Sequence, residues 1–304
     1  MLTSTDNLLS ALSKSIADTV QTVGQSVVAV HGSRRSSSGI HWQPGIIVTS
    51  DEMIKREEAM TVTLPSGQTV PVTVAGRDAS TDVAVLKLLG EELPPTANIG
   101  QPTALQVGHL VLAVGRSREQ GLSASLGAIS LLGQSWQSMR GGLIDQLIRP
   151  DLTLYSEGAG GPLVDAGGTV VGFNTFGPRR SVLTIPATTV QRVLDQLLKQ
   201  GRVARGYLGL GMQPVALPDT LSRRFSLSSQ RGVIVVSVES GGPGDRSGIF
   251  LGDVLVAING TAVTDTGDIQ AVLGPQSVGQ TLAVQLLRGG ELIEVSLEVG
   301  ERGR

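Results

Sequence analysis

The sequence predicts a mainly β protein with two domains and few helices. The chain has 304 residues, enough for two domains of ordinary size. It contains 40 glycines and only 3% aromatic residues, and glycine favours tight turns over helices. Residues 26–185 read as short runs of strand-forming residues, broken by turn formers about every ten positions. Such spacing is typical of a β-barrel or a β-sandwich.

Residues 1–25 are predicted to form an amphipathic helix that covers the first domain or a neighbouring subunit. Apolar side chains recur there at helical spacing: Leu8, Leu9, Leu12, Ile16, Val20 and Val23. The segment lacks the basic start and unbroken apolar block of a signal peptide. No apolar run approaches the ~20 residues that span a bilayer. We therefore expect no membrane span and a cytoplasmic location, or a periplasmic or other extracytoplasmic one if the N-terminus is trimmed.

Composition and charge exclude several classes of function. The formal net charge of −2 gives no general attraction for nucleic acid or an anionic membrane. Without cysteine the chain has neither a catalytic thiol nor cysteine-ligated metal. The three histidines lie far apart and show no metal-ligand spacing; they are His31, His41 and His109. We expect no metal, no cofactor and no nucleic-acid partner.

A single helix and a short linker are predicted over residues 186–205. Pro186 stands at the start of this helix and Gly201 just past its end, as helix punctuation requires. One face is apolar, formed by Val190, Val193, Leu194, Leu197 and Leu198. The short linker "RVARG" then leads into a second domain, residues 206–304.

The second domain carries a set of spaced motifs. "RGYLGLGMQP" is followed by "GVIVVSVESGGPGDRSGIFLGDVLVAINGTAV" and by the helix "DIQAVL". Together they resemble a PDZ domain as found in bacterial PDZ proteases. The resemblance implies an α+β fold that binds peptides. A glycine-rich turn can point consecutive N–H groups at a terminal carboxylate, and the strand after it offers an edge to an extended chain.

Eight residues are candidates for contact with a peptide in this second domain. Four follow one another at the turn and the strand after it, one lies further along the strand, and three lie on the facing helix: Tyr207, Leu208, Gly209, Leu210, Met212, Ile269, Val272 and Leu273. The alternative is that these side chains fill the core of a small domain.

The first domain contains the surroundings of a protease nucleophile without the nucleophile. "YSEGAGGPLVD" followed by "GTVVGFNTF" fits the nucleophile loop of a trypsin-like serine protease, with Ala159 at the serine position. The order of parts resembles the HtrA family, which has a trypsin-like double six-stranded β-barrel, a linking helix and a PDZ domain. By this resemblance "GIIVTSDEMI" places Glu52 at the histidine position, and "STDVAVLKL" supplies Asp82 as the triad aspartate.

These replacements predict a disabled catalytic site. Acyl transfer by a triad needs a hydroxyl, a base and an orienting carboxylate, and only Asp82 of the three is kept. Glu157 occupies the family's glycine position beside the oxyanion, where its charge opposes the chemistry. A Glu52–Asp82 pair would suit acid–base chemistry or a cation, but a solvated glutamate is the simpler interpretation. Ser156 is the nearest other hydroxyl, three positions early.

The leading hypothesis is therefore a proteolytically inactive HtrA-like protein that binds peptides. Its expected partners are protein C-termini, unfolded polypeptide segments and active HtrA relatives, in protein quality control or as a regulatory scaffold. The rival is an active HtrA-type endopeptidase with an unrecognised nucleophile or base. The resemblance also implies a homotrimer, although the first 30 residues lack the aromatic side chains that such contacts commonly use.

Overall fold

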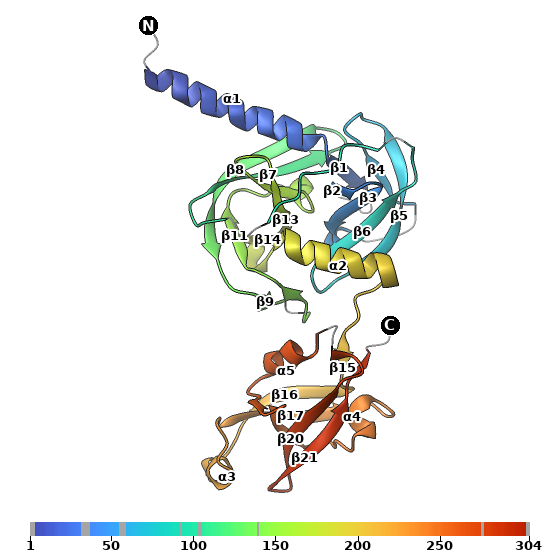
Figure 1. The fold of residues 1–304 in the computed structure, drawn as a ribbon, viewed down its shortest axis with the longest axis vertical. Coiled ribbons are helices and arrows are strands. Elements are labelled where there is room, and N and C mark those ends of the chain that lie inside the picture. Colours follow the sequence, from blue (N-terminus) through green and yellow to red (C-terminus); the bar gives the residue numbers. More distant parts are fainter. Residues whose placement is uncertain are drawn as a thin grey trace. The chain divides into compact units, whose positions relative to one another are not determined.

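The structure is a computed structural model that describes residues 4–31, 37–54, 59–91, 93–101, 105–138, 140–274 and 277–301. The chain divides into two compact units, Met1–Val203 and Ala204–Arg304. Figure 1 shows strands dominating both units. The predicted fold class is confirmed: two closed six-stranded barrels, few helices and a smaller α+β unit.

The first barrel closes in the order β1-β2-β3-β6-β5-β4. Its strands are β1 (Val27–His31), β2 (Ser37–Gln43), β3 (Ile46–Ser50), β4 (Thr61–Thr63), β5 (Thr69–Asp78) and β6 (Val83–Leu88). Along β5 the buried Val70 and Val72 alternate with the exposed Thr69, Pro71 and Thr73. This period of two sends one face of the strand into the barrel and the other to solvent. The turn η1 (Asp51–Met53) follows β3.

The second barrel closes in the order β11-β14-β13-β12-β7-β8. Its strands are β7 (Leu110–Ser117), β8 (Gly121–Leu132), β11 (Ile148–Asp151), β12 (Pro162–Asp165), β13 (Val170–Phe176) and β14 (Val182–Pro186). A separate ribbon joins β9 (Trp136–Gln137) to β10 (Leu143–Ile144). Two short 3-10 turns interrupt the loops, η3 (Ser156–Gly158) and η4 (Pro178–Arg180). The turn η3 lies immediately before Ala159 and so forms part of the candidate site.

Two helices complete the first unit. The helix α2 (Ala187–Gln200) buries Val190, Val193, Leu194 and Leu197 in the largest hydrophobic cluster, and it ends at Gly201 with a φ of 71°. That left-handed residue is the glycine cap that the sequence predicts. The helix α1 (Ser4–Gly24) packs against the same cluster only through its last turns, where Val23 is buried. Its leading leucines are exposed, so the predicted cover of the first domain is only partial: Leu8 68%, Leu9 65% and Leu12 48%.

The second unit is a sheet ordered β16-β17-β18-β20-β21, with β19 paired to β18 and a separate β15–β22 pair. Its strands are β15 (Gly206–Tyr207), β16 (Leu210–Ala216), β17 (Arg231–Val238), β18 (Val254–Ile258), β19 (Thr261–Ala262), β20 (Thr281–Arg288), β21 (Glu291–Glu298) and β22 (Gly300–Glu301). The helices are α3 (Asp219–Arg224), α4 (Pro243–Arg246) and α5 (Thr266–Val272). Asp265 caps α5 through a reciprocal capping box with Asp268. The strand β16 is an edge of the sheet.

Candidate functional site

The carboxylate of Asp82 is contacted by residues of both barrels. It precedes β6 and adopts a φ of 59°, a left-handed conformation that aspartate tolerates better than most residues. Its carboxylate accepts hydrogen bonds from Ser50 Oγ at 2.8 and 2.9 Å, from Thr175 Oγ1 at 2.5 Å and from the Glu52 N–H at 2.9 Å. Ser50 ends β3 of the first barrel and Thr175 belongs to β13 of the second. The carboxylate is therefore fixed by donors from both barrels.

The surroundings of Asp82 raise the pKa of its carboxyl group. Burial raises its pKa from the ordinary 3.8 to about 6, although the donors Thr175, Glu52 and Ser50 act in the opposite direction. The negative charge of Glu52 adds a smaller upward contribution to the pKa. Loss of solvation thus outweighs three hydrogen bonds to the charged form. The Glu52 side chain itself is exposed.

The loop that carries Ala159 packs against the end of β3. Ala159 is only 1% exposed. A Cβ built on Gly160, which has a φ of 79°, would lie 2.5 Å from Thr49 Oγ1 and 3.0 Å from the Ser50 N. Only glycine permits both this dihedral angle and this close approach. The residue after Ala159 therefore packs against Thr49 and Ser50, which directly precede η1 and Glu52, and Ala159 itself carries only a methyl group.

The backbone donors of this loop are directed at its own carbonyl groups. The N–H of Gly158 donates to Tyr155 O at 2.9 Å, and the N–H of Ala159 donates to Ser156 O at 3.4 Å, which closes η3. The carbonyl of Glu157 accepts a hydrogen bond from the buried Ser38 hydroxyl. Stabilisation of an oxyanion requires N–H groups aimed at the position of that oxygen. In this loop the N–H groups of residues 158 and 159 are committed elsewhere.

Each histidine is engaged away from Asp82. His31 Nε2 lies 2.8 Å from Thr63 Oγ1. His41 is buried, and its Nε2 accepts from the Gly45 N–H at 3.0 Å. His109 Nδ1 accepts from the Gln106 N–H at 3.3 Å. Burial lowers the pKa of both His31 and His41, which favours their neutral forms.

Ser156 does not sit in a triad-like arrangement. Its side chain is exposed, and its hydroxyl donates to Glu157 Oε2 at 3.2 Å. A nucleophilic serine needs a base whose orientation is fixed by a third group. Glu157 offers a carboxylate, but Asp82, the predicted triad aspartate, is hydrogen-bonded to Ser50, Thr175 and the Glu52 N–H.

In the second unit, the predicted peptide contacts fall into two sets. Leu208 and Ile269 are 2% and 1% exposed and belong to the core of the unit. The other apolar candidates are partly buried at the surface of that core: Leu210, Met212, Val272 and Leu273. The N–H of Gly206 donates to Leu273 O at 3.3 Å, which joins the start of the glycine-rich turn to the end of α5.

The turn itself is shaped by glycine and held by neighbouring backbone. Gly209 has a φ of 69°. The Leu208 carbonyl accepts from the Gly244 N–H at 2.7 Å, and the Gly209 carbonyl accepts from the Glu239 N–H at 2.8 Å. Sequence reasoning missed one polar contact here, from the Tyr207 hydroxyl to Glu239 Oε2 at 2.5 Å. No motif signals that pair, because 32 residues separate its members in the chain.

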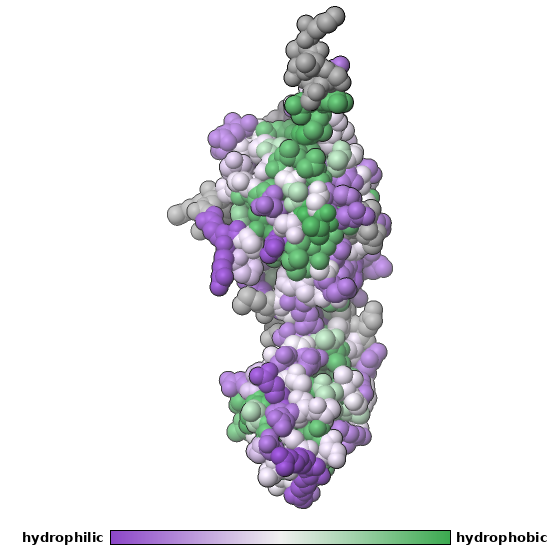
Figure 2. Space-filling view, turned by 90° about the vertical axis from the view of Figure 1, so that its left-hand side faces the viewer, coloured by the Kyte–Doolittle hydropathy of each residue, from purple (hydrophilic) through white to green (hydrophobic). Residues whose placement is uncertain are grey.

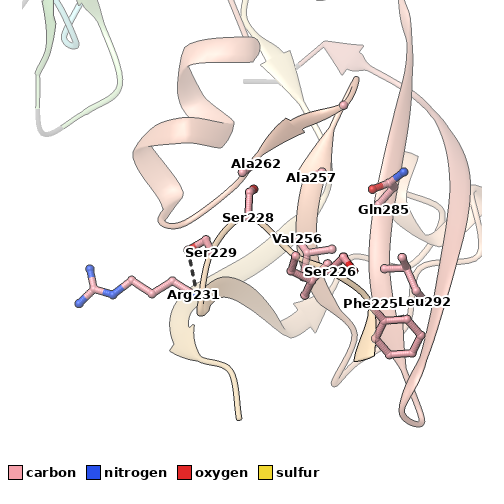
Figure 3. Close-up of a pocket in the computed structure, with 12 residues that line it drawn as sticks. Phe225, Ser226, Ser228, Ser229, Arg231, Val256, Ala257, Ala262, Gln285 and Leu292 are labelled. Atoms are coloured by element: carbon pink, nitrogen blue, oxygen red, sulfur yellow. Dashed lines mark hydrogen bonds between the residues drawn. The ribbon is translucent and has the colours of Figure 1, made fainter. Parts of the chain in front are cut away.

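A separate polar pocket of about 180 Å³ lies under the segment that follows α3. Figure 3 shows Ser226, Ser228 and Ser229 around it, with the side chain of Arg231 pointing away. Its lining includes no residue of β16 or α5, so it is distinct from the predicted peptide site.

Two findings bear on other functions. Among the described residues, no helix is long and apolar enough to cross a bilayer. In the same residues, no group of three or more acidic, histidine or cysteine side chains could hold a metal ion.

Comparison with known proteins places these features in a family. Residues 37–173 match the model of a trypsin-like peptidase domain, and residues 206–299 match that of a PDZ domain. The structure resembles the HtrA-type protease AlgW with tripeptide, at 26% identity and a TM-score of 0.74 over 95% of this chain and 97% of that one. The chain belongs to the HtrA family. A serine endoprotease from Yersinia pestis gives a similar result, with 26% identity, a TM-score of 0.74 and coverage of 94% and 97%.

Curated relatives of this HtrA-family chain carry the name "probable periplasmic serine endoprotease DegP-like". One from Rhizobium meliloti is 33% identical over 85% of this chain and 51% of its own length, and one from Brucella suis is 30% identical over 84% and 50%. The chain thus spans about half the length of these relatives. Their periplasmic names point to an extracytoplasmic location, so the predicted cytoplasmic location is wrong. That prediction relied on the absence of a leader, and an absence at one end carries no information about location.

Proposed function

We propose that this HtrA-family protein binds extended polypeptide through its PDZ domain and does not hydrolyse it. The observation that supports this most strongly is Ala159, which places a methyl group in the loop after η3, while the Asp82 carboxylate is held by Ser50, Thr175 and the Glu52 N–H. The names of the HtrA-type structures with peptide support the binding half of the proposal. The ligands we expect are protein C-termini or unfolded segments.

The physical reason for inactivity is that the missing groups act as one unit. A carboxylate orients a base, but it accelerates nothing without a base and a hydroxyl. In subtilisin, loss of the serine or the histidine alone costs about a millionfold in rate. The Ser156 and Tyr155 carbonyls also accept the N–H groups of Ala159 and Gly158, so stabilisation of an oxyanion would require a rearrangement of η3.

The rival function is an endopeptidase, and the names of the relatives favour it. For this chain it requires Ser156 as the nucleophile and Glu157 as its base, the pair that lies 3.2 Å apart. A carboxylate is a weaker base than an imidazole, so it removes the proton of a serine hydroxyl less readily. We therefore rank this function second.

Both functions can be tested on the full chain. We expect no cleavage of fluorescently labelled unfolded casein over a day. We also expect saturable binding of some members of an octapeptide array, measured by fluorescence anisotropy. Ser156→Ala serves as the matched control, because its loss would abolish activity from the rival site alone. Cleavage that survives repurification and disappears in Ser156→Ala would overturn the proposal.

The biological role that we propose is a scaffold in protein quality control, acting with active HtrA relatives or with copies of itself. The exposed leucines of α1 support self-association, because an uncovered apolar helix face stabilises the molecule only when something buries it. A homotrimer is the assembly that the family resemblance implies.

A further inference from the structure

The proposed PDZ function leaves open whether the bound chain ends at the site or passes through it. The inference below rests on that function and concerns the glycine-rich turn formed by residues 206–210. A free C-terminus brings a carboxylate to the N–H groups of such a turn. An internal segment brings no charge of its own and adds as a strand to an edge. A charge beside the turn should therefore determine whether the domain prefers a free C-terminus or an internal segment.

Glu239 holds its carboxylate against this turn. Its backbone N–H donates to Gly209 O at 2.8 Å, and its carbonyl accepts from the Gly242 N–H at 2.9 Å, so the residue is fixed at both ends. Its Oε2 would lie only 3.5 Å from a Cβ built on Gly209 and 3.4 Å from one on Gly242. The Tyr207 hydroxyl donates to the same oxygen at 2.5 Å. The side chain is exposed to solvent, but the hydrogen bond from Tyr207 holds its carboxylate beside the turn.

The charge of Glu239 is not neutralised by that contact. A tyrosine hydroxyl is a neutral donor at physiological pH. The cation of the adjacent α4, Arg246, directs its Nη1 to Gly241 O at 2.5 Å, and Asp245 accepts from the Gly241 N–H at 2.7 Å. The charged group that these contacts place beside Gly209 is therefore an anion.

The neighbouring strand suits a ligand without a charged end. β16 is the first strand in the order of its sheet, so one of its two edges is not covered by another strand of that sheet. The partly buried Leu210 and Met212 lie on this strand, with Val272 and Leu273 at the end of α5. Backbone hydrogen bonds along an edge hold any extended segment, whatever its position in the chain.

We propose that Glu239, positioned by Tyr207, makes the PDZ domain select internal or uncharged extended segments over free C-terminal carboxylates. Two like charges a few ångströms apart at a protein surface repel each other enough to change affinity about three- to tenfold. Salt screens this repulsion. Binding of free-acid peptides should therefore strengthen as the salt concentration rises, the reverse of binding driven by opposite charges.

The test uses the full chain and one array of octapeptides with varied apolar residues in the last four positions, synthesised both as free acids and as C-terminal amides. We expect the wild type to bind amides about three- to tenfold more tightly than the matching acids. Glu239→Gln should raise affinity for the acids by about the same factor and leave the amides unchanged. Tyr207→Phe, which releases the Glu239 side chain, should give part of that gain.

The control for net charge is Glu294→Gln, an exposed carboxylate on β21 whose partner is Gln285. It makes the same change of charge and should leave the ratio of acid to amide affinity unaltered. Thermal melting establishes that each variant is folded. If the wild type binds acids at least as tightly as amides, and Glu239→Gln shifts both equally, the inference is wrong while the proposed function stands. If no peptide of either form binds any variant, both fail.

Discussion

At the scale of single residues, Asp82 is a buried carboxylate at the position proposed for the triad aspartate. Three donors hold it, yet burial still raises its pKa to about 6. In a working triad the positive charge of an imidazolium would offset the cost of burying the aspartate carboxylate. Here the donors are two hydroxyl groups and one backbone N–H, and all are neutral. Ionised Asp82 should therefore reduce the stability of the fold.

The sign of this effect follows from proton linkage. Between pH 3.8 and about 6 the folded state keeps the Asp82 proton while the unfolded state loses it. Stability from this group thus falls as pH rises through that window. The two pKa values correspond to a difference of about 3 kcal/mol as an upper limit. Asp82→Asn stays neutral, and asparagine tolerates the same left-handed backbone.

We expect the stability of Asp82→Asn relative to wild type to rise between pH 4 and pH 7, measured by urea unfolding at each pH. Asp151→Asn, an exposed carboxylate of the same unit, is the control and should show no such trend. A difference between Asp82→Asn and wild type that stays constant with pH would contradict the pKa assigned to Asp82.

The positions that the family resemblance assigns to the triad could be predicted from sequence, but their surroundings could not. Ala159 is flanked by Gly160-Gly161 and a matching strand, so its place in the loop could be predicted without coordinates. The donors Ser50 and Thr175 are separated by more than a hundred residues, and they meet only because two closed barrels bring β3 and β13 to the same carboxylate. Hydroxyl groups of this kind leave no periodic signal.

At the scale of elements, one serine joins three segments around the loop that carries Ala159. Ser38 on β2 is fully buried. Its hydroxyl accepts from the Arg116 N–H of β7 at 2.8 Å and donates to the Glu157 carbonyl in η3. Its own N–H donates to Ala159 O at 2.9 Å. The first barrel thereby fixes both the loop and the strand beside it.

Ser38→Ala removes one hydroxyl and leaves two part-buried backbone groups, on Arg116 and Glu157, without this partner. The expected loss of unfolding free energy is about 1–3 kcal/mol. The matched control is Ser130→Ala on β8, an exposed serine whose hydroxyl donates to Arg149 O at 2.9 Å. It should change stability by less than about 0.5 kcal/mol. Equal effects in urea unfolding would show that the Ser38 contacts add little.

Elements were predictable where one face is buried and difficult where burial depends on another part of the fold. The spacing of Val190, Val193 and Leu197 predicts the buried face of α2 because the barrels cover it along its length. The same spacing in α1 does not reveal that only its C-terminal part is covered and that Leu12 is exposed. Helical spacing of apolar residues does not show how far a neighbouring surface extends along the helix. Leu208 and Ile269 likewise belong to the core of the second unit, which the pattern could not distinguish from a groove lining.

At the scale of the whole molecule, the apolar surface of the first unit extends beyond α1. Figure 2 shows hydrophobic residues along this helix and on the barrel below it. The barrel contributes Leu110 on β7 and Leu126 on β8, which are 45% and 50% exposed. Leu110 pairs with Ala128, and Leu126 pairs with Leu112, so the two leucines lie on the same side of the β7–β8 ribbon.

The character of this surface favours a protein over a membrane as its partner. Lys14, within the helix, already pairs with Asp18 at 2.7 Å. An interfacial helix for anionic lipid would need a polar face rich in lysine or arginine, and α1 contains one lysine and no arginine. A second copy offers both apolar patches at once, the leucines of α1 and those of the barrel. Repeated contacts between unlike patches form a ring when the rotation between copies closes, and a filament otherwise.

We therefore expect self-association of the full chain through α1. Replacing Leu8, Leu9 and Leu12 with glutamine should convert the oligomer to a monomer in size-exclusion chromatography with light scattering, while the melting temperature of the monomer stays within a few degrees of wild type, because these side chains are exposed. The control replaces Leu89 and Leu93 with glutamine, leucines exposed 58% and 45% in another part of the first unit, and should leave the oligomer intact. A wild-type chain that is monomeric at 100 µM, or a triple variant with unchanged mass, would exclude α1 as the interface.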